Sequence, residues 1–467
     1  MAASEDYGEY AAIMDLKLGV KLVGWLGVAL LVLEGCTGVP TLSERRSRSH
    51  FKVLTQAYRP GEQRARLPQL DNHATLEAFL TYAMLNQPRV AEAYYDYAAS
   101  LERITIERSL PDPRLTLEMD ITDAVMAIMP GLMTELPPMK KLRLRAEVAS
   151  AESESKYFAF QTALLQTAFA VKRAYYQIHF AEGRLQVYRE TLELLGQLEE
   201  LARAQVAVGR GTVQNTFRAR MEQDRLRTEI INGEDARRVL LVQLKAAMGL
   251  RKDDPDPPVP TKFELTPVEP SSTDLPAEAL ALNPRLKAME ADVRAAERGI
   301  ALARTSRQPE FSMGVEANVK ASPVMARPAV GVTLPIWRDK IAAEIEAAQA
   351  RKSAVEARLS AEQIQLAVDY ADKAFSYREA TRALRLLRGT LLPLARQALE
   401  TARIGYSSGG TEFSGLLEAE RSLLDLRLAE VEASTQRELA LAEISLLIVG
   451  TPPPGTPGIE REVALEP

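Results

Sequence analysis

The sequence of 467 residues contains one pattern twice, and this duplication limits the folds that the chain can adopt. Four pairs of markers recur in the same order, at offsets of 196, 196, 198 and 199 residues: Pro88 and Pro284, Pro113 and Pro309, Pro137 and Pro335, Gly211 and Gly410. A register kept over so many markers indicates duplication of one unit of about 170 residues. The proline-rich stretch 253–260 separates the halves and favours an extended linker.

Each half contains a helical stretch far longer than the helices of ordinary globular domains. The sequence predicts a first helical segment from Ala74 to Leu110, broken near Pro88. No proline occurs from Lys140 to Val206, and a helix of that length would extend about 100 Å. Apolar residues recur along it at steps of three and four, which is typical of a coiled coil. In the second half, the proline-free stretch 336–392 repeats this layout before Pro393 interrupts it.

Between the helical stretches of each half lies a segment in which apolar and polar residues alternate strictly. Arg114–Ile121 has apolar residues at every odd position, and Phe311–Lys320 repeats the alternation. Period-two alternation predicts strands with one apolar and one polar face. Each segment has a shorter partner, Gly131–Leu136 in the first half and Ala329–Leu334 in the second. Two interpretations are open: strands with one face in lipid, or soluble hairpins packed on helices.

Four strands in one chain cannot close a barrel. An open sheet edge is unstable in hydrocarbon because its backbone groups remain unpaired, so lipid-facing strands must be shared between chains. Three copies supply twelve strands, an even number within the range of outer-membrane barrels. We therefore expect a mixed membrane protein, mainly α, that combines a long coiled-coil helical barrel with a twelve-stranded trans-subunit β-barrel.

A targeting signal near the N-terminus favours the membrane interpretation. Two lysines precede the apolar run 22–33, which is too short to span a bilayer and is typical of a secretory signal peptide. The single cysteine, Cys36, ends a segment that resembles a bacterial lipobox, although Glu34 departs from that pattern. We interpret Cys36 as a lipid anchor, the alternative being a secreted protein with an incidental cysteine. The long stretch before the signal leaves Met1 and Met14 as alternative starts.

The layout resembles the TolC family of outer-membrane efflux proteins over residues 74–450. Strand pairs that are each followed by a long helix, duplicated in one chain, are specific to that family. Arg403–Gly409 followed by Leu416–Ala419 is similar to the family's Tyr-x-x-Gly turn and the helix start after it. Residues 136–145 and 330–338 resemble its strand-to-helix junctions. The resemblance divides the chain into a signal peptide with lipobox (1–36), an N-terminal periplasmic segment (37–73), a first repeat (74–250), a linker (251–276), a second repeat (277–450) and a tail (451–467).

In the family, the two helix reversals form periplasmic tips that meet an adaptor protein and constrict the channel entrance. The resemblance implies adaptor contacts at Val208, Gly209, Gly211, Tyr406, Gly409 and Gly410. It implies an entrance gate at Arg403, Tyr406, Asn215 and Glu418.

The gate residues depart from the family pattern at two positions. The family often carries acidic residues just after the second reversal, and here Gly415 departs from that pattern whereas Glu418 keeps a carboxylate. Three copies of Glu418 would form a ring that favours cations; the alternative is an ordinary solvated side chain. Asn215 stands where the family has an acid, so a link there would be a hydrogen bond and not an ion pair.

The resemblance implies a homotrimeric channel in the bacterial outer membrane that extends into the periplasm. Such a channel exports substrate passively, and an inner-membrane transporter delivers the substrate through a periplasmic adaptor (membrane fusion) protein. Outer-membrane lipid would contact the barrel. The substrate stays open among drugs, metal ions and proteins. One alternative is a periplasm-spanning structural coiled-coil protein without a pore; another is the adaptor itself, against which the duplication argues.

The composition and the motifs point away from other classes of protein. The net charge of −5 gives no indication of nucleic-acid binding. The sequence contains no Gly-x-Ser-x-Gly, P-loop or His-Glu-x-x-His motif, so we expect no enzyme, no cofactor and no resident metal. Five methionines between Met119 and Met139 could be soft ligands for Cu(I), but apolar packing is the simpler interpretation.

Overall fold

The computed structural model describes residues 39–60, 67–71, 74–121, 125–259, 277–318 and 325–457. Cys36 and the signal-like run before it lie outside these ranges. The chain forms two compact units, and each takes segments from both halves of the sequence. The first holds the described parts of Met1–His50, Tyr97–Ser155 and Glu290–Ala357; the second holds those of Phe51–Asp96, Lys156–Met289 and Arg358–Pro467.

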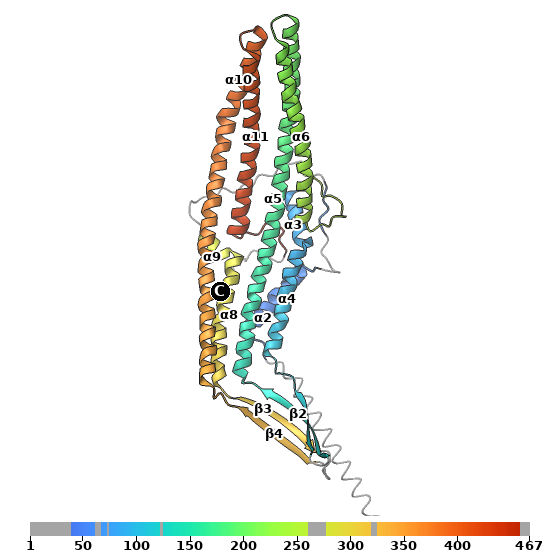
Figure 1. Ribbon diagram of the computed structural model, residues 1–467. Coiled ribbons are helices and arrows are strands. Elements are labelled where there is room, and N and C mark those ends of the chain that lie inside the picture. Colours follow the sequence, from blue (N-terminus) through green and yellow to red (C-terminus); the bar gives the residue numbers. More distant parts are fainter. Residues whose placement is uncertain are drawn as a thin grey trace, which may run out of the picture. The chain divides into compact units, whose positions relative to one another are not determined.

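The first unit contains a four-stranded antiparallel sheet with the strand order β1-β2-β3-β4 (Figure 1). Its strands are β1 (Arg114–Ile121), β2 (Val125–Leu136), β3 (Glu310–Asn318) and β4 (Met325–Thr333). All four expected strands are present. The expectation that each second strand is the shorter one is wrong, since β2 has 12 residues against 8 in β1. Residues 125–130 are apolar throughout, so no alternation marked that part of β2 in the sequence.

The strand register places the alternating positions of all four strands on two chemically distinct faces. Leu115 pairs with Leu132, Leu132 pairs with Val315, and Phe311 pairs with Val332. The face defined by these pairs is apolar at every described position except Thr134. Its members are Leu115, Leu117, Met119, Ile128, Pro130, Leu132, Leu136, Phe311, Met313, Val315, Ala317, Ala326, Pro328, Val330 and Val332. We call this set the apolar sheet face.

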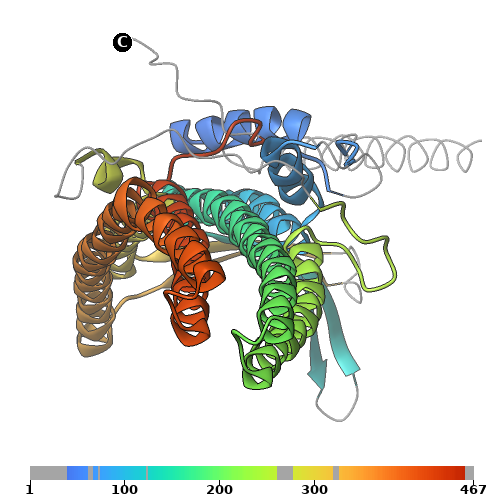
Figure 2. The ribbon, with the colours of Figure 1, turned by 90° about the horizontal axis from the view of Figure 1, so that it is seen from above.

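The second unit is built around two antiparallel helix pairs. One is α5 (Met139–Ala207), which belongs to this unit from Lys156 onward, with α6 (Val213–Ala247), and the other is α10 (Leu392–Ser408) with α11 (Phe413–Glu443). Figures 1 and 2 show α10, α11, α5 and α6 side by side in one curved layer, with α10 and α6 at its two ends below the reversals, whereas near the reversals α6 also contacts α10 and α11. A core cluster joins the pairs and includes Leu195 and Leu198 of α5, Leu226 of α6, and Leu416 and Leu417 of α11. The expected long helix is confirmed, because α5 runs for 69 residues.

The remaining helices complete the pattern of two repeats. The helices of the first half are α2 (Leu42–Ala57), α3 (Leu76–Asn86) and α4 (Pro88–Arg108); those of the second are α7 (Ala277–Leu282), α8 (Pro284–Ala303), η1 (Arg304–Arg307), α9 (Arg338–Leu386), η2 (Leu387–Leu391) and η3 (Ile444–Ile448). The π-helical turn η2 lies just before Pro393, which cannot donate to the carbonyl four residues earlier. None of the helices in the described ranges combines bilayer-spanning length with sufficient hydropathy.

An asparagine closes the first repeat at the break between α3 and α4. The side-chain amide of Asn86 donates to the backbone carbonyls of Met248 and Gly249, at 3.1 Å each, where α6 ends. Gly249 adopts a left-handed φ of 71°, and a Cβ there would lie 2.8 Å from the backbone of Asn86. Pro88 is the first residue of α4, where a missing N–H leaves no helical hydrogen bond unmade.

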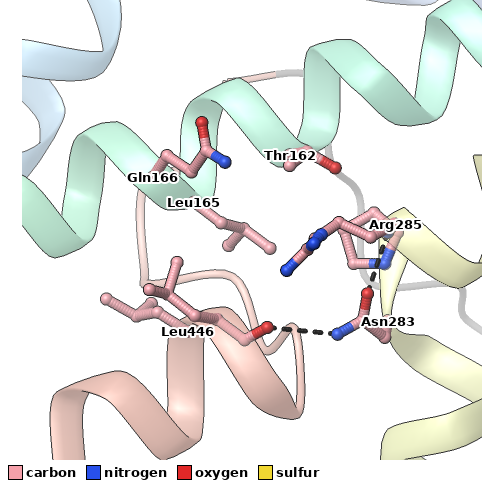
Figure 3. Close-up of a pocket in the computed structure, with 8 residues that line it drawn as sticks. Thr162, Leu165, Gln166, Asn283, Arg285 and Leu446 are labelled. Atoms are coloured by element: carbon pink, nitrogen blue, oxygen red, sulfur yellow. Dashed lines mark hydrogen bonds between the residues drawn. The ribbon is translucent and has the colours of Figure 1, made fainter. Parts of the chain in front are cut away.

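The second repeat closes on the same arrangement, shown in Figure 3. Asn283 donates to the carbonyls of Leu447 and Ile448 at 3.1 and 2.9 Å, at the end of η3. Gly450 follows with a φ of 79°, close to Pro284 at the start of α8. The Asn and Pro that recur in the two halves therefore have a structural role, because each asparagine binds the backbone at the end of its own repeat. We call these two contacts the asparagine corners.

Candidate functional site at the helical tips

The two helix reversals of the second unit have the same backbone geometry. Gly209 and Gly409 both adopt left-handed conformations, with φ of 74° and 86°, which a side chain would strain. The N–H of Gly211 donates to the carbonyl of Gln205 at 3.0 Å, and the N–H of Thr411 donates to that of Gly405 at 3.2 Å. Each helix end thus has its last carbonyls satisfied by the turn that follows.

Tyr406 joins the two helix pairs just below the reversals. Its ring is 6% exposed and packs on Phe413 with the ring centroids 5.2 Å apart. The amide nitrogen of Asn215, on α6, donates to its hydroxyl oxygen at 3.5 Å. Tyr406 and Asn215 are therefore in contact, through a long hydrogen bond between neutral groups.

Further polar contacts bridge the two helix pairs. Gln205 donates from its side chain to the carbonyl of Ser407 at 3.0 Å, which links one reversal to the other. Lower down, Arg427 of α11 pairs with Glu190 of α5. Hydrogen bonding by Arg427, with a smaller share from Gln186, lowers the pKa of Glu190. These contacts hold the pairs together in the conformation seen here.

The other expected gate residues face outward. Arg403 is exposed, with its guanidinium 4.0 Å from Glu400. Glu418 is exposed on α11 and forms no ion pair within the described part of the chain. The expectation that Tyr406 also contacts an adaptor does not fit this conformation, because its ring lies inside the core. Val208, by contrast, is 66% exposed beside Gly209.

One residue that the sequence reasoning missed is Glu420. It is 3% exposed and follows the buried Phe413 and Leu417 of α11 at the spacing of a coiled-coil core. A carboxyl in an otherwise apolar series is the signal that would have identified it. Burial, and then the neighbouring Glu222, raise the pKa of Glu420 to about 7, while Arg421 opposes the shift.

The site offers electrostatic and packing interactions between the helices. Among the described residues, no three His, Cys, Asp or Glu side chains are placed to hold a metal ion.

Comparisons with known proteins give a consistent picture. A sequence model of the outer membrane efflux protein family matches residues 80–250 and 275–450. No curated protein matches the chain. Among solved structures, the chain is similar to the open state of the outer membrane channel MtrE of Neisseria gonorrhoeae, with 17% identity, a TM-score of 0.69, and coverage of 84% of this chain and 97% of the other.

Two further solved structures share the fold. The outer membrane channel CmeC of Campylobacter jejuni matches with 13% identity and a TM-score of 0.70, over 86% of this chain and 91% of the other. The outer membrane protein VceC of Vibrio cholerae matches with 16% identity and a TM-score of 0.67, over 80% and 96%. At such identities the likeness concerns the fold.

Proposed function

The chain belongs to the outer membrane efflux protein family, whose members are channels and not enzymes, and on this premise we propose that three copies form one gated export duct. In this proposal the duct conducts passively. An inner-membrane pump supplies the energy, and a periplasmic adaptor (membrane fusion) protein delivers substrate to the helical tips.

The apolar sheet face is the observation that carries the proposal. Leu115 is 82% exposed, Val330 is 71% exposed and Met313 is 55% exposed, so the face is uncovered in one chain. Contiguous apolar surface of this kind marks a lipid or protein contact. The opposite face carries Arg114, Glu118 and other polar groups, as a water-filled lumen requires.

The edges of the sheet support assembly from several copies. The order β1-β2-β3-β4 leaves one edge of β1 and one edge of β4 unpaired among the described strands. Open edges are unstable in hydrocarbon, so β1 of one copy would pair with β4 of the next. Three copies then close a barrel of twelve strands.

The helical layer has two exposed ends that suit the same ring. At one end, α6 exposes the apolar side chains of Phe217, Met221, Ile231, Val239 and Val242. At the other end, α9 and α10 expose those of Ile364, Val368, Phe375, Leu386, Leu394 and Ile404. Contact between two different faces of identical chains is heterologous and closes into a ring when the rotation allows.

In the proposed gate, the two helix pairs of each copy separate to widen the entrance. Tyr406 and Asn215 hold the pairs together, and Arg403 and Glu418 face outward near the opening. The exposed reversals, with Val208, Gly209, Gly211, Gly409 and Gly410, offer small or apolar surface to an adaptor. Lipidation of Cys36, which lies outside the described residues, would add an anchor in the outer membrane.

Single-channel conductance in planar bilayers tests the duct. The purified protein should run as a trimer in detergent and conduct weakly, and Tyr406→Phe combined with Arg403→Ser should raise its conductance. Arg396→Ser, at an exposed arginine of the same helix, is the matched control and should leave conductance unchanged. A trimer that conducts under none of these substitutions would favour a structural coiled-coil protein without a pore.

A further inference from the structure

Glu420 occupies a core position between the two helix pairs. Its neighbours in the α11 series, Phe413, Leu416 and Leu417, are 2%, 0% and 5% exposed, and Glu420 itself is 3% exposed. Leu424, four residues further on, packs against the same cluster. A carboxyl group in such a series is stable when neutral and costly when ionised, because water cannot solvate the charge.

Two of the three charged groups that act on Glu420 are negative, and the single cation among them, Arg421, is shared with Glu222. From α6, Glu222 faces it, and Glu222 is already paired with Arg421 of α11. Asp425, five residues further along α11, adds a second negative charge. No described cation forms an ion pair with Glu420 itself.

Among the described residues of α5 and α10 at this level, the basic side chains are either paired or exposed. On α5, Glu199 is held by Arg203, Arg220 and Gln223 at 2.6, 2.7 and 2.9 Å. On α10, Leu399 faces the core whereas Arg396 and Glu400 are exposed. Glu420 is therefore a buried carboxyl beside other carboxylates, at the contact that must break if the helix pairs separate.

We propose that Glu420 is a proton-dependent brake on the entrance: with its proton bound it holds α11 against α6, and loss of the proton favours separation of the two helix pairs. The proposal rests on the proposed function, because it concerns the regulation of the same gate. The proposal concerns Glu420 and not Glu418, because Glu420 is buried between the helix pairs whereas Glu418 is exposed to solvent.

The direction of the effect follows from linkage. With the pairs in contact the pKa of Glu420 is about 7, because burial and Glu222 favour the neutral form, whereas a solvated glutamate has the ordinary value of 4.5. The contact state binds the proton more tightly, so lower pH favours contact and higher pH favours separation. Between pH 6 and pH 8 the ratio of separated to joined pairs should rise by at most about tenfold, and it should level off above pH 8.

Two measurements test the brake on the reconstituted full-length protein. The first is the distance between spin labels placed at Arg210 and Ser408, exposed residues of the two reversals, from pH 5.5 to pH 8.5. The second is single-channel conductance over the same range. In the wild type the population with long distances and the open probability should both grow as pH rises.

Three substitutions separate the brake from other causes. Glu420→Gln, which mimics the neutral carboxyl, should keep the short distance at every pH. Glu420→Leu should do the same and controls for a defect specific to the amide. Glu432→Gln, at an exposed glutamate of the same helix, should behave as the wild type.

The outcomes distinguish the brake from the duct. If Glu420→Gln and Glu420→Leu keep the wild-type dependence of distance on pH, the brake is refuted. If the distances respond as expected but no variant conducts, the brake stands and the proposed duct fails.

Discussion

The corner at Asn283 gives the sharpest test of how the repeats are held closed. The side chain is fully buried, donates to two carbonyls at 3.1 and 2.9 Å, and accepts from the N–H groups of Arg285 and Leu286 at 2.8 and 3.4 Å. Asn283→Ala leaves these backbone groups without their partner. At roughly 1 kcal/mol for each hydrogen bond, discounted for the longest, the loss is about 3 kcal/mol.

The first repeat provides a matched control. Asn86 donates to two carbonyls at 3.1 Å, and the neighbouring Gln87 donates to Ala246 and Ala247 at 3.0 and 2.9 Å. Asn86→Ala leaves the Gln87 contacts in place, so its cost should be smaller, about 1–2 kcal/mol. Pro284 follows Asn283 directly, so the second corner has no counterpart of Gln87.

Hydrogen exchange measured by mass spectrometry is the assay, because it reports local opening without requiring reversible unfolding. A loss of 3 kcal/mol should speed exchange in peptides covering 284–290 and 444–450 by about 100-fold in Asn283→Ala. Peptides 246–250 and 84–90 should change by about tenfold in Asn86→Ala. Exchange that is unchanged at 284–290, or an effect that is larger at the first corner, would refute the reasoning.

Three further predictions concern the sheet, a reversal and pH. Leu115→Arg on the apolar sheet face should cost about 2–4 kcal/mol of insertion energy if that face meets lipid as proposed, and it should reduce the amount of protein in the outer-membrane fraction. Thr116→Arg on the polar face should insert normally in the same fractionation assay. Gly409→Ala should lower the thermal midpoint measured by circular dichroism, at a cost of about 1–2 kcal/mol, since its φ of 86° strains any side chain. Hydrogen bonding by Arg220 lowers the pKa of Glu199. The ionised Glu199 therefore stabilises the fold above its unfolded pKa near 4.5, and this stabilisation is lost as the pH falls through the lower pKa of the folded state. Glu199→Gln should make the loss of stability with falling pH less steep, and an unchanged acid-unfolding profile would contradict this prediction.

The architecture was largely predictable from the sequence, because its signals are periodic and repeated. Alternation identified β1 in full, and the absence of proline identified α5 to within a residue at each end. The start of β2 was not predictable, since Val125–Pro130 is apolar throughout and period two cannot be seen in a uniform run. The π-helical turn before Pro393 was also missed, because a proline marks an interruption without specifying its geometry.

The site was predictable only where it depends on local turn chemistry. Gly209 and Gly409 were identified because helix reversals need left-handed residues. The contact between Asn215 and Tyr406 joins residues 191 positions apart, and the resemblance to a family implied a hydrogen bond at Asn215 without naming its partner. The burial of Glu420 depends on which face of α11 meets α5 and α6, and a coiled-coil pattern alone does not say which polar residue will be enclosed.

The asparagine corners and the sheet depend on contacts between residues far apart in the sequence. Each corner joins residues more than 160 positions apart, 162 at the first corner and 165 at the second. Closing loops of that size has an entropic cost of roughly 4–5 kcal/mol before any contact compensates for it. The first corner can form once residue 249 has emerged, but β2 cannot pair with β3 until residue 311 is present. The sheet can therefore be completed only after the first corner can close, and its apolar face and unpaired strand edges are prone to aggregation while the second half of the chain is still missing.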